Sequence, residues 1–224
     1  LTIAQLGPYK ESTDRATRRA ALEAEGGFFD EHREEFDSLF SQLVKNRTEQ
    51  AKKLGFESFV ELGALRRQRN CYSPADIARF RDDVVRDLVP LTMRLKERQA
   101  CRLGISDFQF WDNALKFRDG SAAPQGSPEE ILAAGKKMYA ELSPETAEFI
   151  SLMFENGLFD VLAKEGKAPG GYCTGLEDYG YPFIFSNFNS TSGDVDVLTH
   201  EAGHAFADYT ATKTVPVHAL RCPT

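Results

Sequence analysis

The 224-residue sequence lacks any apolar run approaching the ~18 residues that a membrane-spanning helix needs. The residues near Leu1 do not show the pattern of a secretory signal peptide, which is a charged segment followed by an apolar segment and then by small residues. These absences argue against a membrane partner and against classical secretion.

Cysteine is also scarce. The four cysteines are Cys71, Cys101, Cys173 and Cys222, and no two of them have the C-x₂-C spacing of a structural zinc site. A large acidic chain with so few scattered thiols is typical of a reducing compartment. We therefore expect reduced cysteines and a cytoplasmic location.

Basic residues are outnumbered, which leaves a formal net charge of −7. This balance argues against nucleic acid as a partner. The one basic cluster, Arg66, Arg67 and Arg69, is interpreted as a solvated helix face. With 42% hydrophobic residues, the composition is that of a globular protein with a core.

Most of the first two thirds of the chain has helical character. Residues 12–25 are rich in helix formers, and Gly26-Gly27 is expected to interrupt them. From Phe28 an apolar stripe at helical spacing predicts a helix that ends near Leu54-Gly55. Its apolar positions are Phe29, Phe36, Leu39, Phe40, Leu43 and Val44.

Three Ser-Pro pairs predict helix starts, because serine caps the free backbone N–H groups and proline suits the first helical position. They begin at Ser73, Ser127 and Ser143. The first of these helices should run toward Leu103-Gly104, with a kink at Pro90.

The pattern changes near Gly166. Residues 167–171 are interpreted as a flexible turn, and residues 172–174 and 181–188 are rich in aromatic and β-branched residues that favour strands. A final helix should run from about 191 to 212, with Thr191 and Asp194 as a capping box. The fold class is therefore mainly α: a multi-helix domain over 1–224, with a helical scaffold (1–165) and a small β element preceding a last helix (166–224).

That last helix carries His200-Glu201-Ala202-Gly203-His204. Two histidines four residues apart lie on one helix face, one turn apart, and can bind one zinc ion. Glu201 can then serve as general base toward a zinc-activated water molecule, which is the chemistry of an H-E-x-x-H motif. The alternative to metal binding is a purely structural role, in which the two histidines are hydrogen-bonded within the core.

Other candidate ligands are weaker. Asp208, one turn beyond His204, is a candidate for orienting a ligand imidazole, or else a solvent-facing charge. His218 and His32 are interpreted as packing or surface residues. A catalytic zinc site usually has three protein ligands, and the third is not obvious in this sequence.

Over nearly its whole length the sequence resembles the oligoendopeptidase F group of zinc metallopeptidases, relatives of thimet oligopeptidase. The resemblance rests on Gly170-Gly171-Tyr172-Cys173, on Pro182 to Asn189 (PFIFSNFN) and on Asp194 to Phe206 (DVDVLTHEAGHAF). It implies a mainly helical peptidase domain, His200 and His204 as zinc ligands, and Glu201 as general base. It also implies peptide binding along Tyr181 to Asn189, for which Phe185, Asn187, Phe188 and Asn189 are the candidate contacts.

In that family the third zinc ligand is a glutamate at a position beyond Thr224, so we expect a partial domain. The leading hypothesis is a zinc endopeptidase that hydrolyses short unstructured peptides. One alternative is that the chain by itself is a non-catalytic helical scaffold with an incomplete metal site. Another is a different H-E-x-x-H lineage, such as a carboxypeptidase. The oligomeric state is not predicted.

Overall fold

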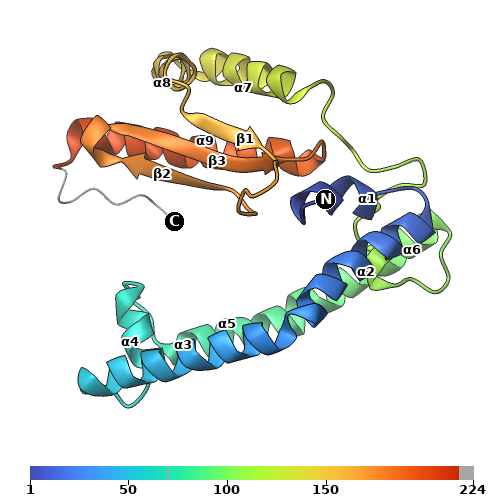
Figure 1. The fold of residues 1–224 in the computed structure, drawn as a ribbon, viewed down its shortest axis with the longest axis horizontal. Coiled ribbons are helices and arrows are strands. Elements are labelled where there is room, and N and C mark those ends of the chain that lie inside the picture. Colours follow the sequence, from blue (N-terminus) through green and yellow to red (C-terminus); the bar gives the residue numbers. More distant parts are fainter. Residues whose placement is uncertain (70, 217–224) are drawn as a thin grey trace. The chain divides into compact units, whose positions relative to one another are not determined.

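The structure is a computed structural model that describes residues 1–69 and 71–216. Helices dominate it, and a small sheet precedes the last helix (Figure 1), which confirms the predicted fold class. No helix in the described ranges is long and apolar enough to cross a membrane. The α-helices are α1 (Gly7–Lys10), α2 (Arg15–Glu31), α3 (Arg33–Lys53), α4 (Phe59–Arg66), α5 (Pro74–Asp83), α6 (Val89–Leu103), α7 (Pro128–Leu142), α8 (Pro144–Glu155) and α9 (Ser192–Thr214).

The chain divides into two compact units. One is Leu22–Asn113, and the other combines Leu1–Ala21 with Ala114–Thr224. This division does not coincide with the expected change from scaffold to β element between residues 165 and 166. The first strand, β1 (Phe159–Leu162), also lies before that position.

In the first of these units, the predicted interruption at Gly26-Gly27 is wrong. Helix α2 continues through both glycines to Glu31. A helical glycine costs about 1 kcal/mol relative to alanine but does not remove a backbone hydrogen bond, so strong helix formers around it sustain the helix. Helix α3 ends at Lys53, close to the predicted position.

The apolar stripe of residues 29–44 is helical as predicted but does not form a core. Phe29, Phe36 and Phe40 are 46, 45 and 67% exposed. Helical periodicity shows which residues share a face, and it does not show whether another segment covers that face.

Pro90 is accompanied by an irregular turn, as expected from its missing N–H. A π-helical turn, Val84–Leu88, separates α5 from α6. The N–H of Val89 donates to the carbonyl of Val84, five residues earlier. Such a turn relieves the clash and the lost hydrogen bond that a proline introduces into a continuous helix.

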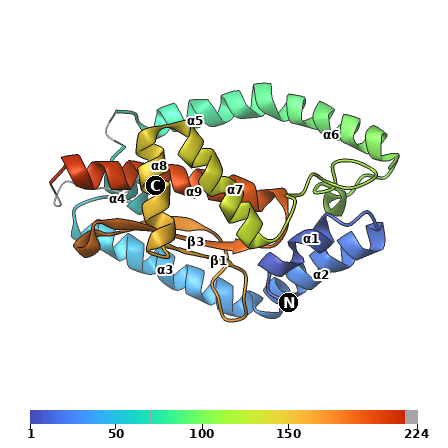
Figure 2. The same cartoon turned by 90° about the horizontal axis from the view of Figure 1, so that it is seen from above.

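The sheet belongs to the second unit. Its strand order is β1-β3-β2, with β2 (Tyr172–Leu176) antiparallel and β1 parallel to the central strand β3 (Tyr181–Phe188). Figures 1 and 2 show α9 running alongside β3. Along β3 every second residue is buried, because alternate side chains of a strand face opposite sides of the sheet.

Helices α7 and α8 complete the core of this unit. Both begin at the predicted Ser-Pro pairs, where Ser127 and Ser143 each form a capping box. The core joins the two helices to the sheet and to α9. Its buried members are Tyr139, Phe149, Ile150, Met153, Leu158, Ile184, Ala202, Ala205 and Tyr209.

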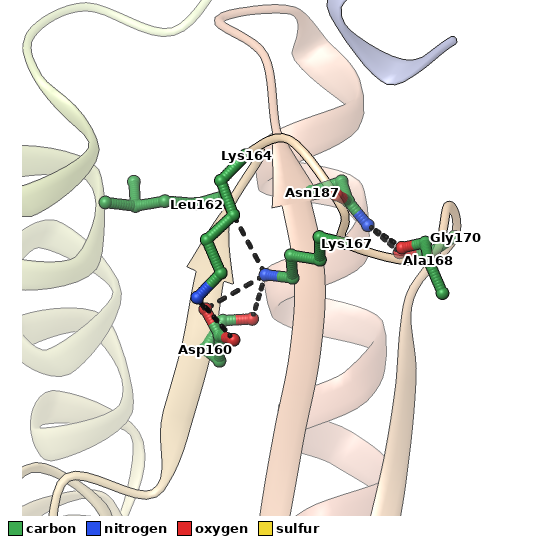
Figure 3. A network of polar contacts seen from close by, with 7 residues as sticks. All are labelled: Asp160, Leu162, Lys164, Lys167, Ala168, Gly170 and Asn187. Carbon is green, nitrogen blue, oxygen red and sulfur yellow. Dashed lines mark hydrogen bonds and ion pairs between the residues drawn. The ribbon is translucent and has the colours of Figure 1, made fainter. Parts of the chain in front are cut away.

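The turn before β2 is held by Lys167 (Figure 3), which is a correction to its interpretation as flexible. The Lys167 side chain is only 2% exposed. Its ammonium donates to the carbonyls of Asp160 and Leu162, both at 2.9 Å, and to the Asp160 carboxylate at 3.0 Å. It also lies 4.4 Å from the ring centre of Phe185. The hydrogen bond from Lys167 lowers the pKa of the Asp160 carboxyl.

Asn187 holds the other half of the same turn. Its amide donates to the carbonyls of Ala168 and Gly170, each at 2.9 Å (Figure 3). The glycine-rich segment is therefore tied both to β1 and to β3. This fixes the point from which β2 starts.

Replacing Lys167 by methionine should lower the free energy of unfolding by about 2 kcal/mol, because it removes three hydrogen bonds that a buried ammonium donates to part-buried and exposed acceptors. Lys164→Met is the matched control, since Lys164 also pairs with Asp160 but its side chain is 62% exposed. The control should cost less than about 0.5 kcal/mol. Urea unfolding of both variants measures this, and equal losses would contradict a special role for Lys167.

Candidate functional site

The start of α9 is set by Asp194. This buried carboxylate accepts the backbone N–H groups of Asn189 at 2.9 Å and Ser190 at 2.8 Å. Ser190 has a φ of 68°, which is the left-handed conformation. The two hydrogen bonds to Asp194 stabilise this turn between β3 and α9. Burial raises the pKa of Asp194, while the two backbone hydrogen bonds oppose the rise.

The expected capping box between Thr191 and Asp194 is therefore wrong. Thr191 is the N-cap residue, but its side chain makes no capping hydrogen bond. Its hydroxyl donates instead to the Asn189 side-chain oxygen at 2.8 Å. Asp194 reaches back past Thr191 because the turn at Ser190 presents two N–H groups together.

His200 and His204 converge. Their Nε2 atoms are 3.0 Å apart, while His200 is exposed and His204 half-buried. Two imidazole nitrogens bound tetrahedrally to one zinc ion at 2.0–2.1 Å lie about 3.3 Å apart. The pair therefore fits a shared metal ion with only a small adjustment.

The packing of α9 makes this pair accessible. Ala202 and Ala205 are fully buried in the core, so the opposite side of the helix is free to carry the imidazoles. Around Gly203 nothing lies within 4 Å of an added Cβ atom. Glu201, which follows His200 in the chain, is 8% exposed and so largely removed from water.

Two predicted ligands, His200 and His204, lie together, and no third joins them in the described ranges. In the described ranges 1–69 and 71–216, no group of three or more His, Cys, Asp or Glu side chains could hold a metal ion. His218 and Cys222 lie outside those ranges. A complete catalytic site of this kind needs a further ligand.

Strand β2 lies directly on α9. A Cβ atom added to Gly171 would come within 2.9 Å of Val197, and one added to Gly175 within 2.9 Å of Asp208. Val197 and Asp208 share a helix stripe with Glu201 and His204 by their spacing of four, three and four residues. The two glycines therefore let β2 pass close to the residues of the motif.

The alternative that Asp208 is a solvent-facing charge is wrong. It is 5% exposed, and burial followed by the nearby Glu177 charge raises its pKa. Among the described residues no hydrogen bond joins it to His204. Its role in orienting a ligand imidazole stays a prediction.

The four residues proposed to contact a peptide have other roles in this structure. Phe188 is a core residue at 5% exposure, and Phe185 is stacked on Tyr172 with ring centres 4.9 Å apart. Asn187 holds the turn before β2, and the Asn189 amide donates to the carbonyl of Ala4 at 2.8 Å. Peptide contact by these side chains stays a prediction.

The expectation that a peptide adds its backbone along Tyr181 to Asn189 needs correction. Strand β3 is central and pairs with β1 on one side and β2 on the other. Addition of a strand requires a free edge. Within the described sheet, β2 is the edge strand that lies on α9, and sequence alone could not distinguish it from a central strand.

Comparison with known proteins identifies the family. The sequence matches the model of peptidase family M3 over residues 8–224. The oligoendopeptidase F homolog of Lactococcus lactis subsp. lactis (strain IL1403) is 25% identical over 210 residues, which are 92% of this chain and 33% of that protein. Group B oligopeptidase PepB of Streptococcus agalactiae serotype III (strain NEM316) is 23% identical over 197 residues, or 87% of this chain and 31% of that protein.

A solved structure of PZ peptidase A with an inhibitor shares 52% sequence identity and superposes with a TM-score of 0.93. The match covers 95% of this chain and 38% of that one. The chain thus spans about a third of the length of the curated relatives it matches.

The buried Asp208 carboxylate makes a pH-dependent prediction. Because its pKa is raised in the folded state, its charge opposes folding above that pKa, and the opposition vanishes below the unfolded value near 3.8. Asp208→Asn should therefore raise the unfolding free energy at pH 7, and the gain should disappear as the pH falls below about 4. Asp196→Asn, at an exposed position of the same helix, is the control. A gain independent of pH would contradict the prediction.

Proposed function

This chain belongs to peptidase family M3, and on that premise we propose that it carries two zinc ligands and the general base of a metalloendopeptidase acting on short unstructured peptides. The observation that carries the proposal is the convergence of the His200 and His204 Nε2 atoms, 3.0 Å apart. It occurs on a helix whose opposite side is locked into the core.

His200 and His204 would hold the zinc ion. Neutral imidazole nitrogens suit zinc among several transition metals, and the choice of zinc also rests on the resemblance to zinc metallopeptidases. When bound, zinc supplies a Lewis acid that activates a water molecule and polarises the scissile carbonyl. A further ligand would complete the site.

Glu201 would take the proton of the attacking water and pass it to the leaving amine. It follows His200 directly, so the two side chains point in directions about 100° apart around the helix. The carboxylate thus lies beside the metal ligands without being one of them. Its low exposure keeps competing water away from the proton transfer.

The peptide would bind as an extended strand along β2. This strand has one free edge within the described sheet, and Gly175, together with Gly171 just before the strand, lets it lie against α9. Backbone hydrogen bonds at a sheet edge bind peptides without demanding particular side chains. An extended, unfolded substrate is the form of chain that can offer such bonds.

A cytoplasmic location is part of the same proposal. It rests on the acidic composition and the few scattered cysteines, which suit a reducing compartment.

The second candidate is that this chain by itself is a non-catalytic scaffold with an incomplete metal site. The observation that favours it is the lack of a three-ligand cluster in the described part of the chain. The two candidates differ in zinc affinity and in turnover, and the next two experiments separate them.

Glu201→Gln should lower kcat for an internally quenched peptide by at least about 10²-fold, because the amide cannot accept the proton. The measurement uses a protein of the relatives' length that contains this chain. Zinc content should stay unchanged, since Glu201 is not a ligand. Unaltered turnover in the variant would refute the role of Glu201.

The 224-residue chain purified alone should hold well under one equivalent of zinc by elemental analysis, because two imidazoles bind zinc more weakly than a three-ligand site. His204→Ala should abolish the remainder, whereas His32→Ala, at the residue between α2 and α3, should not. One tightly held equivalent, with chelator-sensitive cleavage, would show that a third ligand comes from this chain or a second copy.

A further inference from the structure

A cavity of about 120 Å³ lies where β2 ends, between this strand and the last turns of α9. It belongs entirely to the unit that contains the sheet. A volume of this size holds several water molecules, and therefore also a small charged group. Its lining residues are Thr174, Gly175, Leu176, Glu177, Tyr181, Asp208 and Thr212.

Asp208 is a buried residue that lines this cavity. It is 5% exposed, and its carboxylate sits against Gly175, where an added Cβ atom would come within 2.9 Å of Oδ2. Among the described residues it has neither a hydrogen bond nor an ion pair. A carboxylate removed from water without a partner is costly, so the cavity is the direction from which a partner can reach it.

Glu177 lines the same cavity from the 3₁₀ turn Glu177–Tyr179, between β2 and β3. Its charge adds to the effect of burial in raising the pKa of Asp208. No cationic side chain is among the lining residues. The lysine of α9, Lys213, donates to Glu148 at 2.9 Å.

Two carboxylates with a space between them and no cation are complementary to a positive group. A guanidinium suits such a site, because its planar set of N–H donors can serve both carboxylates at once. An ammonium provides three donors and fits the same volume. A cation in this position would also remove the cost of the charged, buried Asp208.

We propose that Asp208 and Glu177 form a cation-binding pocket that receives the arginine or lysine side chain of a peptide bound along β2. This rests on the proposed function, since it assigns a side-chain preference to the same substrate site. The cavity adjoins the last residues of β2, so a peptide strand on that edge passes close to it. An arginine or lysine of the longer protein has the same chemistry, and the two sources are distinguished below.

The binding test uses the 224-residue chain and two probes, acetyl-arginine amide and the uncharged acetyl-citrulline amide. The arginine probe should shift the backbone amide resonances of Gly175, Glu177 and Asp208, and citrulline should not. Asp208→Asn and Glu177→Gln should each weaken the arginine response at least tenfold. Asp196→Asn, which removes an exposed charge from the same helix, should leave it unchanged. An equal response to citrulline, or no loss in either variant, would overturn the proposal.

The turnover test uses a protein of the relatives' length and a pair of peptides that differ only by arginine or citrulline at one position, scanned along the peptide. At one position kcat/KM should favour arginine at least tenfold, and Glu177→Gln and Asp208→Asn should bring the ratio close to one. If Asp208 merely orients His204, its replacement would slow both peptides equally, and the ratio would stay unchanged.

The outcomes of the two tests also distinguish failure of the cation pocket from failure of the proposed peptidase function. Hydrolysis of both peptides without preference would retain the peptidase and overturn the pocket as a substrate site. If the shorter chain still binds the arginine probe in that case, the cation comes from the longer protein itself. Probe binding without any hydrolysis would retain the pocket and reject the function.

Discussion

The packing of α9 on the buried side of β3 is the constraint on which the rest of the site depends. Ala202 and Ala205 have no exposed surface, and they contact a core built from α7, α8 and Ile184 of β3. Such small side chains let helix and sheet approach closely, and close packing leaves little freedom for rotation of the helix. The rotation decides where His200, Glu201 and His204 point. The histidine pair is thus positioned by core residues on the opposite side of the helix.

Polar side chains support this arrangement at both ends of the sheet. Asp194 joins the end of β3 to the start of α9, while Lys167 and Asn187 hold the turn from which β2 begins. Each side chain bonds to two backbone groups and so holds them in place. These three side chains therefore fix the end of β3, the start of α9 and the start of β2. Asn187 and Lys167, which the sequence suggested as a peptide contact and part of a flexible turn, serve this structural purpose.

The described part of the chain contains some of the groups that the proposed peptidase site needs and not others. It has two convergent imidazoles, a largely buried carboxylate beside them and an edge strand next to both. It also has many exposed aromatic and aliphatic side chains on α2, α3 and α6, and it spans about a third of its curated relatives' length. Two adjacent histidines on a helix that packs into the core, in a chain of this coverage, suit the proposal that other segments of a longer protein supply the remaining groups of the site.

Local features of the sequence determined most of the helices, two of the three strands and the close approach of His200 and His204, but they did not predict β1. Ser-Pro starts, the spacing of four between His200 and His204, and the run of aromatic residues in β3 depend only on near neighbours. Tertiary structure alone decided that β3 is central and β2 the edge, that Asp194 bonds to Asn189 and Ser190, and that Asp208 meets Gly175 in a shared cavity. Strand order and side-chain partners join residues far apart in the chain, and periodicity indicates which side a residue faces but not what lies there.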